Sequence, residues 1–496
     1  MKNIFQKIKH VADNHPLKRA VIVVDKAGNE SRTVSYQTLV VDVEACARSL
    51  LRSGIAPEET VAVVFPNSYD FVVAVLAVFA IGGRLLPLNP GFREDEIIYC
   101  LNSTATRAIF YPKGLDTVAS YIEEKGVAAF CHTNFAQEPE DLSINLPLLT
   151  AEDSGCGGVY MFSSGSTGKS KRISRSQQDI LHEFDMLAQT VSLSDDEVML
   201  CPVPMYHAHG FGNGLMGALL SGSLLVISEA EFNGRRVVKL LEDYAVTVFP
   251  AVPFMLKMIA LSRFKIEPAL GNLRLLISAG APLELDTSRK LLNQFGLRAT
   301  QLYGSTETGV IAINLSFDEE SMASVGRPVI GVKIEIRDEN GDVLTAGEKG
   351  EVWIKSPAMA QGYDNFSELT QECFIDGWFF TGDLGRIDSR GQLFLLGRKK
   401  LMIIVAANKV DPLEVESLLK EHHDVDDVVV VGEKHAVYGE TVKAYIVTDR
   451  EDEREFGEWL RRFVAEKLVE YKVPTTFEFI AEIPKSPLGK VLRKYL

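Results

Sequence analysis

A chain of 496 residues is too long for one hydrophobic core, so two or more domains are expected. With 46% hydrophobic and 24% charged residues, its composition is that of an ordinary globular protein. The formal net charge of −15 excludes a general nucleic-acid binder, because such a protein needs a basic face to displace counterions from phosphates.

The cysteines and the N-terminal segment predict a cytoplasmic protein. Six cysteines are scattered without a CxxC pair, which fits a reducing compartment and argues against a zinc site. Residues 1–8 lack the continuous apolar core of a signal peptide. The longest apolar stretch, residues 71–81, is well short of the ~20 residues that span a bilayer, so it predicts a buried helix and no membrane span.

Predicted strands and helices alternate through roughly the first three hundred residues. A strand at 60–65, an apolar helix at 69–81 and a strand at 85–90 predict one βαβ unit of a parallel sheet. Further elements follow in the same pattern: strands at 159–162, 197–201, 223–227, 247–249 and 273–278, and helices around 180–187 and at 211–220. This repetition predicts two packed α/β sheets.

After about residue 325 the pattern changes to short alternating strands, with turns at 339–342, 347–350 and 388–391. From residue 398 onward, two helices and two strands predict a compact α+β module. The expected fold is therefore α/β. Residues 1–398 form a large domain of two packed sheets with a small β-rich subdomain, and residues 399–496 form a small mobile C-terminal domain.

The run FSSGSTGKSK, residues 162–171, is predicted to hold a phosphate group. Its small residues let an anion approach the backbone N–H groups, its hydroxyls add donors, and Lys169 and Lys171 add positive charge. The strand before it and the helix after it predict a strand–loop–helix arrangement.

Other interpretations of this loop fit the sequence less well. A Walker P-loop, GxxxxGK[ST], requires glycine where Ser163 stands. A nucleophile elbow, GxSxG, requires glycine at Ser164 if Ser166 is the nucleophile. A Gly- and Ser-rich surface linker is the remaining alternative.

Together with four further motifs in the same order, this loop resembles the adenylate-forming (AMP-binding) enzymes, which include acyl- and aryl-CoA synthetases, luciferases and peptide-synthetase adenylation domains. The further motifs are YGSTE at 303–307, with SAGAPL at 278–283 just upstream, then TGD at 381–383, GR at 397–398 and PKSPLGKVLR at 484–493. The resemblance covers essentially the whole chain.

The resemblance implies a site for ATP and Mg²⁺. The phosphates would be held by the loop residues Ser163, Ser164, Gly165, Ser166, Thr167, Gly168 and Lys171. Adenine and the acid's carboxylate would lie against Gly280, Ala281, Pro282, Tyr303 and Gly304. Thr306 would contact the α-phosphate, Glu307 would hold magnesium as a hard oxygen ligand, and Asp383 and Arg398 would reach the ribose hydroxyls.

The catalytic residues implied by the resemblance are Thr306, Glu307, His207 and Lys490. Lys490 would bridge the carboxylate and the α-phosphate and neutralise charge in the transition state. His207 would stand beside an aromatic residue that gates the acyl site. The C-terminal domain would swing about the hinge residue Lys400 between the two half-reactions.

The implied reaction activates a carboxylic acid as an acyl-adenylate with release of pyrophosphate, and then transfers the acyl group to a thiol, that of CoA. Loading of a phosphopantetheinyl carrier protein in secondary metabolism is the alternative. An adenylate-binding regulator without turnover is a third hypothesis, which the retention of Glu307 and Lys490 opposes.

Three positions depart from the family pattern. Ser170 replaces the usual proline, and Arg172 replaces the usual glycine and adds a cation after the loop. Ala407 replaces a glycine beside the pantetheine tunnel, where a Cβ narrows the approach of another chain. CoA and a carrier protein therefore both stay open as acceptors.

The residues expected to surround the acid substrate indicate its chemical class. In family members that activate amino acids, an aspartate after the gate holds the amine. Residues 199–220 hold no aspartate, so the resemblance implies a plain carboxylic acid. Phe254, Met255 and Met258 supply apolar bulk suited to an aryl or medium acyl chain, although core packing explains them equally well.

Two histidine patterns resemble other kinds of site, an acyltransferase motif and a metal site, that the chain is not expected to contain. HHDVDD at 422–427 matches the HHxxxD pattern of condensation-type acyltransferases, but it lies between a helix and a strand, which favours a solvated turn. The pair His207 and His209 lacks the third ligand that a metal site requires.

Overall fold

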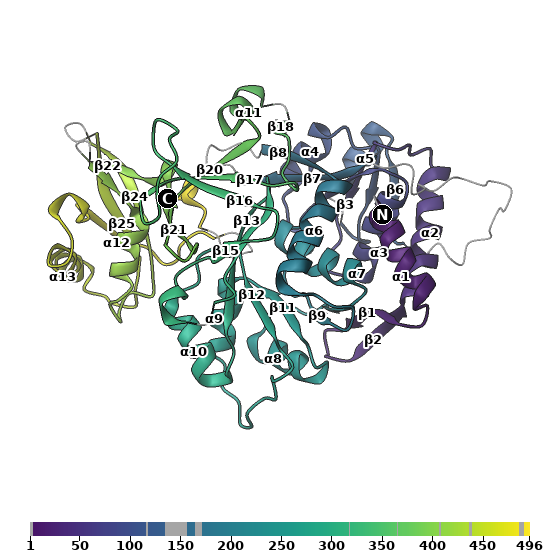
Figure 1. Cartoon of the computed structure of the whole chain (residues 1–496), viewed down its shortest axis with the longest axis horizontal. Coiled ribbons are helices and arrows are strands. Elements are labelled where there is room, and N and C mark those ends of the chain that lie inside the picture. The colour runs from purple at the N-terminus through teal and green to yellow at the C-terminus, as the bar shows by residue number, and fades with distance from the viewer. Residues whose placement is uncertain are drawn as a thin grey trace. The chain divides into compact units, whose positions relative to one another are not determined.

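The computed structural model describes residues 3–115, 118–133, 156–163, 171–316, 318–364, 366–405, 408–435, 439–485 and 491–496. The chain forms two compact units, traced in Figure 1. Unit 1 comprises Met1–Met322, Pro328–Lys333 and Lys355–Phe374. Unit 2 comprises Ala323–Arg327, Ile334–Ile354 and Ile375–Leu496. The predicted α/β class, with large and small parts, is confirmed.

A nine-stranded sheet in unit 1 has the order β15-β14-β13-β12-β11-β9-β10-β1-β2. Its strands are β1 Arg19–Val24, β2 Glu30–Ser35, β9 Val198–Leu200, β10 Leu224–Ser228, β11 Val248–Ala251, β12 Leu275–Ser278, β13 Ala299–Ser305, β14 Gly309–Ile313 and β15 Arg327–Pro328. The strands from β13 to β10, together with β1, run parallel to one another. The predicted strands at 197–201, 223–227, 247–249 and 273–278 all belong to this sheet.

A seven-stranded sheet, also in unit 1, has the order β18-β8-β7-β4-β3-β5-β6. Its strands are β3 Thr60–Val63, β4 Arg84–Pro87, β5 Ala108–Phe110, β6 Ala128–Phe130, β7 Gly158–Ser163, β8 Lys171–Ser176 and β18 Tyr363–Asp364. The predicted βαβ unit is confirmed, since β3 and β4 are parallel neighbours. Two packed α/β sheets, each with its own parallel run, are therefore present as expected.

The helices of unit 1 are α1 Ile4–Asn14, α2 Tyr36–Arg52, α3 Tyr69–Ala80, α4 Glu94–Ser103, α5 Ala119–Lys125, α6 Gln177–Val191, α7 Gly217–Ser221, α8 Gly234–Asp243, α9 Pro253–Ala260, α10 Leu285–Phe295 and α11 Ser367–Cys373. Helix α3 begins where Ser68 accepts a hydrogen bond from the N–H of Phe71, and every residue in it except Asp70 is buried. A helix that is apolar on all sides lies inside a protein, as the sequence predicted.

The arrangement around the phosphate loop differs from the prediction. The sequence indicated strand, loop and helix, but a second strand, β8, follows the loop and pairs antiparallel with β7, with Ser163 opposite Lys171. Helix α6 begins only at Gln177, where Ser176 and Asp179 form a capping box. Because β8 reads KRISRS, its polar residues hid the strand, and Ile173 is its one fully buried hydrophobic residue. The loop therefore joins two strands of a hairpin.

Unit 2 contains two five-stranded sheets. The first joins β16 Lys333–Arg337, β17 Gly350–Lys355, β19 Phe374–Ile375, β20 Trp378–Ile387 and β21 Leu393–Arg398. The second joins β22 Ile403–Val405, β23 Asn408–Val410, β24 Asp427–His435, β25 Gly439–Val447 and β26 Thr476–Phe479. Helices α12 Pro412–Leu419 and α13 Glu453–Ala465 pack on the second sheet through a core that includes Val415, Leu419, Phe456 and Leu460.

The compact units group the chain differently from the predicted boundary after Arg398. The β-rich segment 334–354 and the strands of 375–398 pack with the C-terminal module in unit 2. The predicted boundary after residue 398 and the mobility of the C-terminal domain stay predictions.

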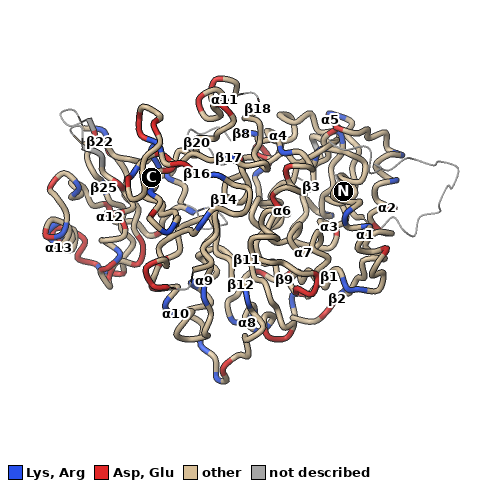
Figure 2. Tube along the Cα trace, viewed as in Figure 1, with Lys and Arg blue, Asp and Glu red and all other residues tan. Residues whose placement is uncertain are grey.

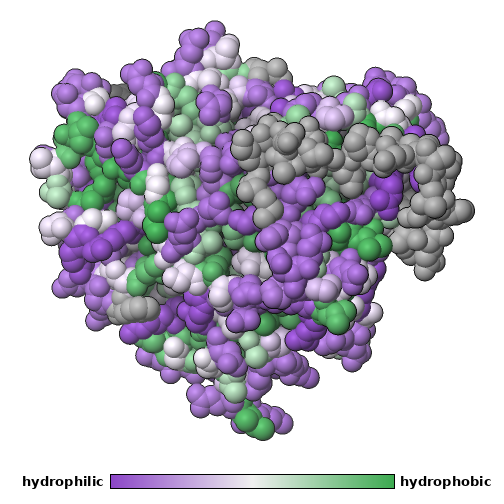
Figure 3. Space-filling view, turned by 45° about the vertical axis from the view of Figure 1, so that its right-hand side comes forward, coloured by the Kyte–Doolittle hydropathy of each residue, from purple (hydrophilic) through white to green (hydrophobic). Residues whose placement is uncertain are grey.

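The surface carries both signs of charge. Lysines, arginines and carboxylates are interspersed over both units (Figure 2). On the face drawn in Figure 3, hydrophobic residues occur in separate patches among hydrophilic ones. Within the described ranges, no helix is long and apolar enough to cross a membrane.

A buried ion pair connects the seven-stranded sheet of unit 1 with the nine-stranded sheet. The guanidinium of Arg175 on β8 lies 2.7 Å from the carboxylate of Glu183 on α6. Glu183 also accepts a hydrogen bond from the N–H of Val310 on β14, at 3.1 Å, and Arg175 donates to the carbonyl of Ala358 at 3.2 Å. The pair therefore connects the strand after the phosphate loop with the nine-stranded sheet.

Removing one partner of this pair is expected to destabilise unit 1. Glu183→Ala leaves the Arg175 guanidinium buried without its counter-charge, which costs about 3–5 kcal/mol of unfolding free energy. Asp185→Ala on the same helix removes a half-exposed ion pair with Lys7 and should cost no more than about 1 kcal/mol. Urea unfolding of both variants measures the difference, and equal small losses would contradict the structural role of Glu183.

Candidate active site

The motif segments of unit 1 gather at one edge of the nine-stranded sheet. Strands β9, β11, β12 and β13 are parallel neighbours, so their carboxyl ends lie side by side. Of the predicted residues, His207 follows β9, and Gly280, Ala281 and Pro282 follow β12. Tyr303 and Gly304 lie near the end of β13, and Thr306 and Glu307 come directly after that strand. Ligands of parallel sheets bind beyond the carboxyl ends of the strands. The sheet order thus places these residues where a ligand is expected.

The segment after β12 is exposed and needs a glycine. Gly280, Ala281 and Pro282 are all exposed, directly beyond the buried Ser278. Gly280 has φ of +93°, which side chains with a Cβ rarely adopt. The turn therefore presents backbone and small side chains to whatever lies above the strand end.

The phosphate loop is described only at its two ends. Ser163 closes β7 and Lys171 opens β8, while Ser164, Gly165, Ser166, Thr167 and Gly168 lie outside the described residues. The ammonium of Lys171 lies 4.7 Å from the centre of the Tyr363 ring. Lys171 therefore stays at the loop and faces an aromatic residue of β18.

Tyr363 connects the end of the phosphate loop with Glu307. Its hydroxyl donates a hydrogen bond of 2.9 Å to Oε1 of Glu307, and its ring contacts Lys171. The backbone carbonyl of Glu307 accepts a further hydrogen bond from the N–H of Ala360, at 2.8 Å. Sequence reasoning missed Tyr363, because only the pairing of β18 with β8 brings it to this position. The loop end and the predicted magnesium ligand are thus joined by one side chain.

Arg172 makes structural contacts rather than extending toward the loop. Its Nε lies 3.1 Å from a carboxylate oxygen of Asp364, and its guanidinium lies 4.9 Å from the centre of the Tyr160 ring. This side chain holds β18 against β8, and so helps to place Tyr363.

His207 and His209 lie at the start of the π-helix η2, Gly210–Met216. Burial lowers the pKa of each to about 4, so both are neutral at physiological pH. Nε2 of His207 is buried and has no hydrogen-bond partner within the described ranges, and the Tyr206 ring centre lies 4.7 Å from that of His207. His209 contacts the Ala251 carbonyl through Nε2 at 3.1 Å and the Asn213 amide nitrogen through Nδ1 at 2.8 Å.

Two of the three predicted acyl-site hydrophobics stand at the surface. On helix α9, which follows β11, Phe254 is 53% and Met258 is 41% exposed, whereas Met255 is buried. Core packing therefore explains Met255 but does not explain Phe254 and Met258.

In unit 2, Asp383 and Arg398 meet directly. They are register partners on β20 and β21, and Nε of Arg398 lies 2.9 Å from Oδ1 of Asp383. Asp383 is buried and Arg398 is half exposed, so the pair presents a carboxylate and a guanidinium together. Lys400 follows in the short helix η4, Lys399–Leu401, while Ala407 and Lys490 lie outside the described residues.

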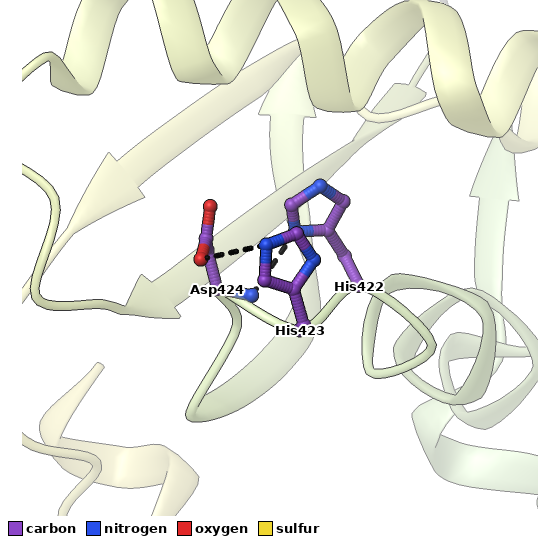
Figure 4. A group of neighbouring side chains, drawn as sticks. All are labelled: His422, His423 and Asp424. Carbon is purple, nitrogen blue, oxygen red and sulfur yellow. Dashed lines mark hydrogen bonds and ion pairs between the residues drawn. The ribbon is translucent and has the colours of Figure 1, made fainter.

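The HHDVDD segment forms the predicted turn between α12 and β24. Figure 4 shows His422, His423 and Asp424 together, with His423 Nε2 at 3.2 Å from Asp424 Oδ1. The other Asp424 oxygen is held by Arg450 at 2.8 Å, and Asp424 N–H donates to Nδ1 of His422. Asp424 is thus held by contacts with both histidines of the turn and with Arg450.

The neutral histidines make the stability of unit 1 depend on pH. Their folded-state pKa of about 4 lies below the ordinary value of 6.5, so the unfolded chain binds more protons between these values. The free energy of unfolding should therefore fall as pH falls from about 6.5 to about 4. His207→Gln and His209→Gln should each weaken this dependence in urea unfolding at several pH values. An unchanged pH dependence in both variants would contradict the buried neutral state.

Comparison with known protein families gives matches over most of the chain. Residues 8–364 match the family model of the AMP-binding enzyme, and residues 414–490 match that of the AMP-binding enzyme C-terminal domain. A feruloyl-CoA synthase of an Amycolatopsis species is 30% identical over 93% of this chain and 92% of its own length. A 2-succinylbenzoate–CoA ligase of Bacillus licheniformis is 27% identical over 99% of this chain and 98% of its own length.

Solved structures share the fold over the whole chain. ATP-bound MatB from Rhodopseudomonas palustris is 27% identical with a TM-score of 0.89, covering 100% of this chain and 98% of its own. The first family model covers the predicted phosphate loop and Glu307, and the second extends to Lys490. The chain belongs to the AMP-binding enzyme family, and it is an ATP-dependent, AMP-forming acid–CoA ligase of the acyl- and aryl-CoA synthetase type.

Proposed function

We propose that this ligase activates a plain aryl or medium-chain carboxylic acid, and that the residues at the sheet edge of unit 1 perform the first half-reaction. The observation that carries the proposal is the gathering of His207, 280–282 and 303–307 at the ends of neighbouring parallel strands. The exposed Phe254 and Met258 on the helix after β11 supply an apolar surface beside this edge. The relatives named for feruloyl and 2-succinylbenzoate groups support an aryl acid.

In this proposal the acid's carboxylate attacks the α-phosphate of ATP, forming the acyl-adenylate and releasing pyrophosphate. The thiol of CoA then attacks the acyl carbon and AMP leaves. The imidazole of His207 is uncharged at physiological pH, so it forms no ion pair with the carboxylate that would oppose its attack. Thr306 faces the α-phosphate, and Lys490 neutralises the charge that develops there.

The residues present fit a magnesium ion. Glu307 offers a hard carboxylate ligand, and the hydrogen bond from Tyr363 occupies Oε1 and fixes the orientation of the group. Glu307 would hold the ion, which when bound would offset the negative charge of the phosphates. Asp383 with Arg398 would bind the ribose, and Lys400 would act as the hinge.

Two features of the chain bear on the finer specificity. The absence of an aspartate from residues 199–220 removes the usual partner of an α-ammonium group, so α-amino acids are poor candidates. Ala407 stands where the family usually has a glycine beside the pantetheine tunnel, and for this reason transfer to a carrier protein is tested beside transfer to CoA.

Pyrophosphate release across a panel of acids tests the proposal. Aryl and medium-chain acids should support release and, with CoA, form thioesters, whereas α-amino acids should not. Lys490→Ala should abolish acid-dependent ATP–pyrophosphate exchange while soluble expression is unchanged. Lys485→Ala is the matched control in the same tail, since Lys485 pairs with Asp427. Near-normal exchange in Lys490→Ala, or preference for α-amino acids, would refute the proposal.

Tyr363→Phe tests the proposed positioning of Glu307. The change removes one hydrogen bond to a carboxylate, which is worth about 1.5–3 kcal/mol, and keeps the ring that contacts Lys171. The free Mg²⁺ concentration for half-maximal exchange should rise by roughly tenfold. Tyr445→Phe loses a hydroxyl contact of 2.7 Å in unit 2 and serves as the control. An unaltered Mg²⁺ dependence in Tyr363→Phe would contradict this role.

A further inference from the structure

A buried acceptor without a partner lies in the π-helix that follows His209. Asn213 is 6% exposed, and its Oδ1 atom is buried with no hydrogen-bond partner among the residues that the structure describes. A buried acceptor left unpaired costs about 1–3 kcal/mol. A π-helical turn is itself uncommon and occurs frequently at functional sites.

The direction of the Asn213 side chain follows from its neighbours. A Cβ on Gly212 would lie 3.3 Å from the Glu183 carboxylate, and a Cβ on Gly214 would lie 2.3 Å from the Cys201 sulfur. These two positions therefore face helix α6 and the end of β9. Asn213 instead shares a face with His209, to which its amide is hydrogen-bonded.

The orientation of the Asn213 amide is fixed by a chain of hydrogen bonds. The Ala251 carbonyl can only accept, so Nε2 of His209, 3.1 Å away, carries the imidazole proton. Because His209 is neutral, its Nδ1 is then an acceptor. The Asn213 group 2.8 Å from Nδ1 must donate and is the NH₂ end of the amide. Oδ1 is consequently the end left without a partner.

This acceptor lies at the same strand edge as the predicted substrate residues. Ala251 is the last residue of β11, and its carbonyl also accepts the N–H of Ala279, which begins the segment containing Gly280. Ser278, the register partner of Ala251, has a buried hydroxyl that is likewise without a partner in the described part of the chain. One unpaired polar group is thus linked to the Ala251 carbonyl through His209, and the other belongs to the register partner of Ala251 on β12.

We propose that Oδ1 of Asn213 accepts a hydrogen bond from a hydroxyl or amino group carried by the acid substrate. The enzyme then prefers an acid that bears such a donor over the same acid with the donor removed or methylated. This inference rests on the proposed function, because it assigns Asn213 to the binding of the acid. His209 acts as a positioning residue that keeps the oxygen end of the amide turned toward the substrate.

The test compares matched acids in the pyrophosphate-release assay. Ring-hydroxylated cinnamates are paired with their methyl ethers and with cinnamate, and medium-chain acids with and without a terminal hydroxyl form a second set. In the best pair, kcat/KM should favour the hydroxyl compound by at least roughly tenfold, the factor that about 1.4 kcal/mol represents.

Two variants report on the origin of the preference. Asn213→Leu keeps the number and branching of the side-chain heavy atoms without the polar ones, and it should reduce the ratio to within about threefold of unity. His209→Phe removes the acceptor that orients the Asn213 amide, so the amide can turn and present its NH₂ end. The kcat/KM of the methyl ethers should then rise relative to that of the hydroxyl acids. Thermal melting confirms that each variant is folded.

The outcomes separate this inference from the proposed function. If no acid releases pyrophosphate with the wild-type enzyme, the proposed function fails. If acids react but every matched pair differs by less than about threefold, Oδ1 is paired with retained water and the inference is overturned. A preference that survives in Asn213→Leu also overturns it. Should Asn213→Leu not fold, the wild-type ratios and the His209→Phe ratios decide.

Discussion

The buried ion pair between Arg175 and Glu183 is the constraint on which the site in unit 1 depends. Arg175 belongs to the strand that follows the phosphate loop, and Glu183 binds the backbone of β14 in the other sheet. Gly309 and Gly212 lie close to the Glu183 carboxylate, where a Cβ at either would come within 2.5 or 3.3 Å of it. The loop hairpin, the strand after YGSTE and the π-helix are thereby held at fixed positions around one carboxylate.

The proposed site residues of unit 1 form two groups, one with charged side chains and one with neutral side chains. Lys171, Tyr363 and Glu307 form a chain of contacts, in which the proposed phosphate-binding lysine and the proposed magnesium ligand both contact Tyr363. His207 and His209 are partly buried and neutral at physiological pH, and Asn213 is buried and uncharged. If the proposed roles hold, charged groups serve the phosphates and the metal, and neutral hydrogen-bonding groups select the acid.

The sequence predicted those parts of the fold that depend on local pattern. Apolar runs located the parallel strands and the wholly buried helix α3, and the order of the motifs identified the family. The hairpin strand β8 was missed because its alternation is mostly polar and only Ile173 is fully buried. Its place in the sheet comes from pairing with β7 and β18, which no local pattern reports.

Sequence patterns also could not identify residues whose roles depend on contacts with residues far away in the chain. Glu183 looks like a helix-surface residue, and Tyr363 looks like an ordinary aromatic before a helix. Their roles arise from contacts across more than fifty positions, at Val310 and Glu307. The role inferred for His209 likewise depends on its contacts with Ala251 and Asn213, which the HxH pattern does not indicate.

The central claim is that the separated motifs bind one nucleotide together, and a crystal structure of the enzyme with MgATP and a substrate acid tests it most directly. The account predicts that the phosphates contact the 163–171 loop, that the metal contacts Glu307, and that the ribose contacts Asp383. A nucleotide bound away from the 303–307 segment, or contacting only one of these motifs, would contradict it.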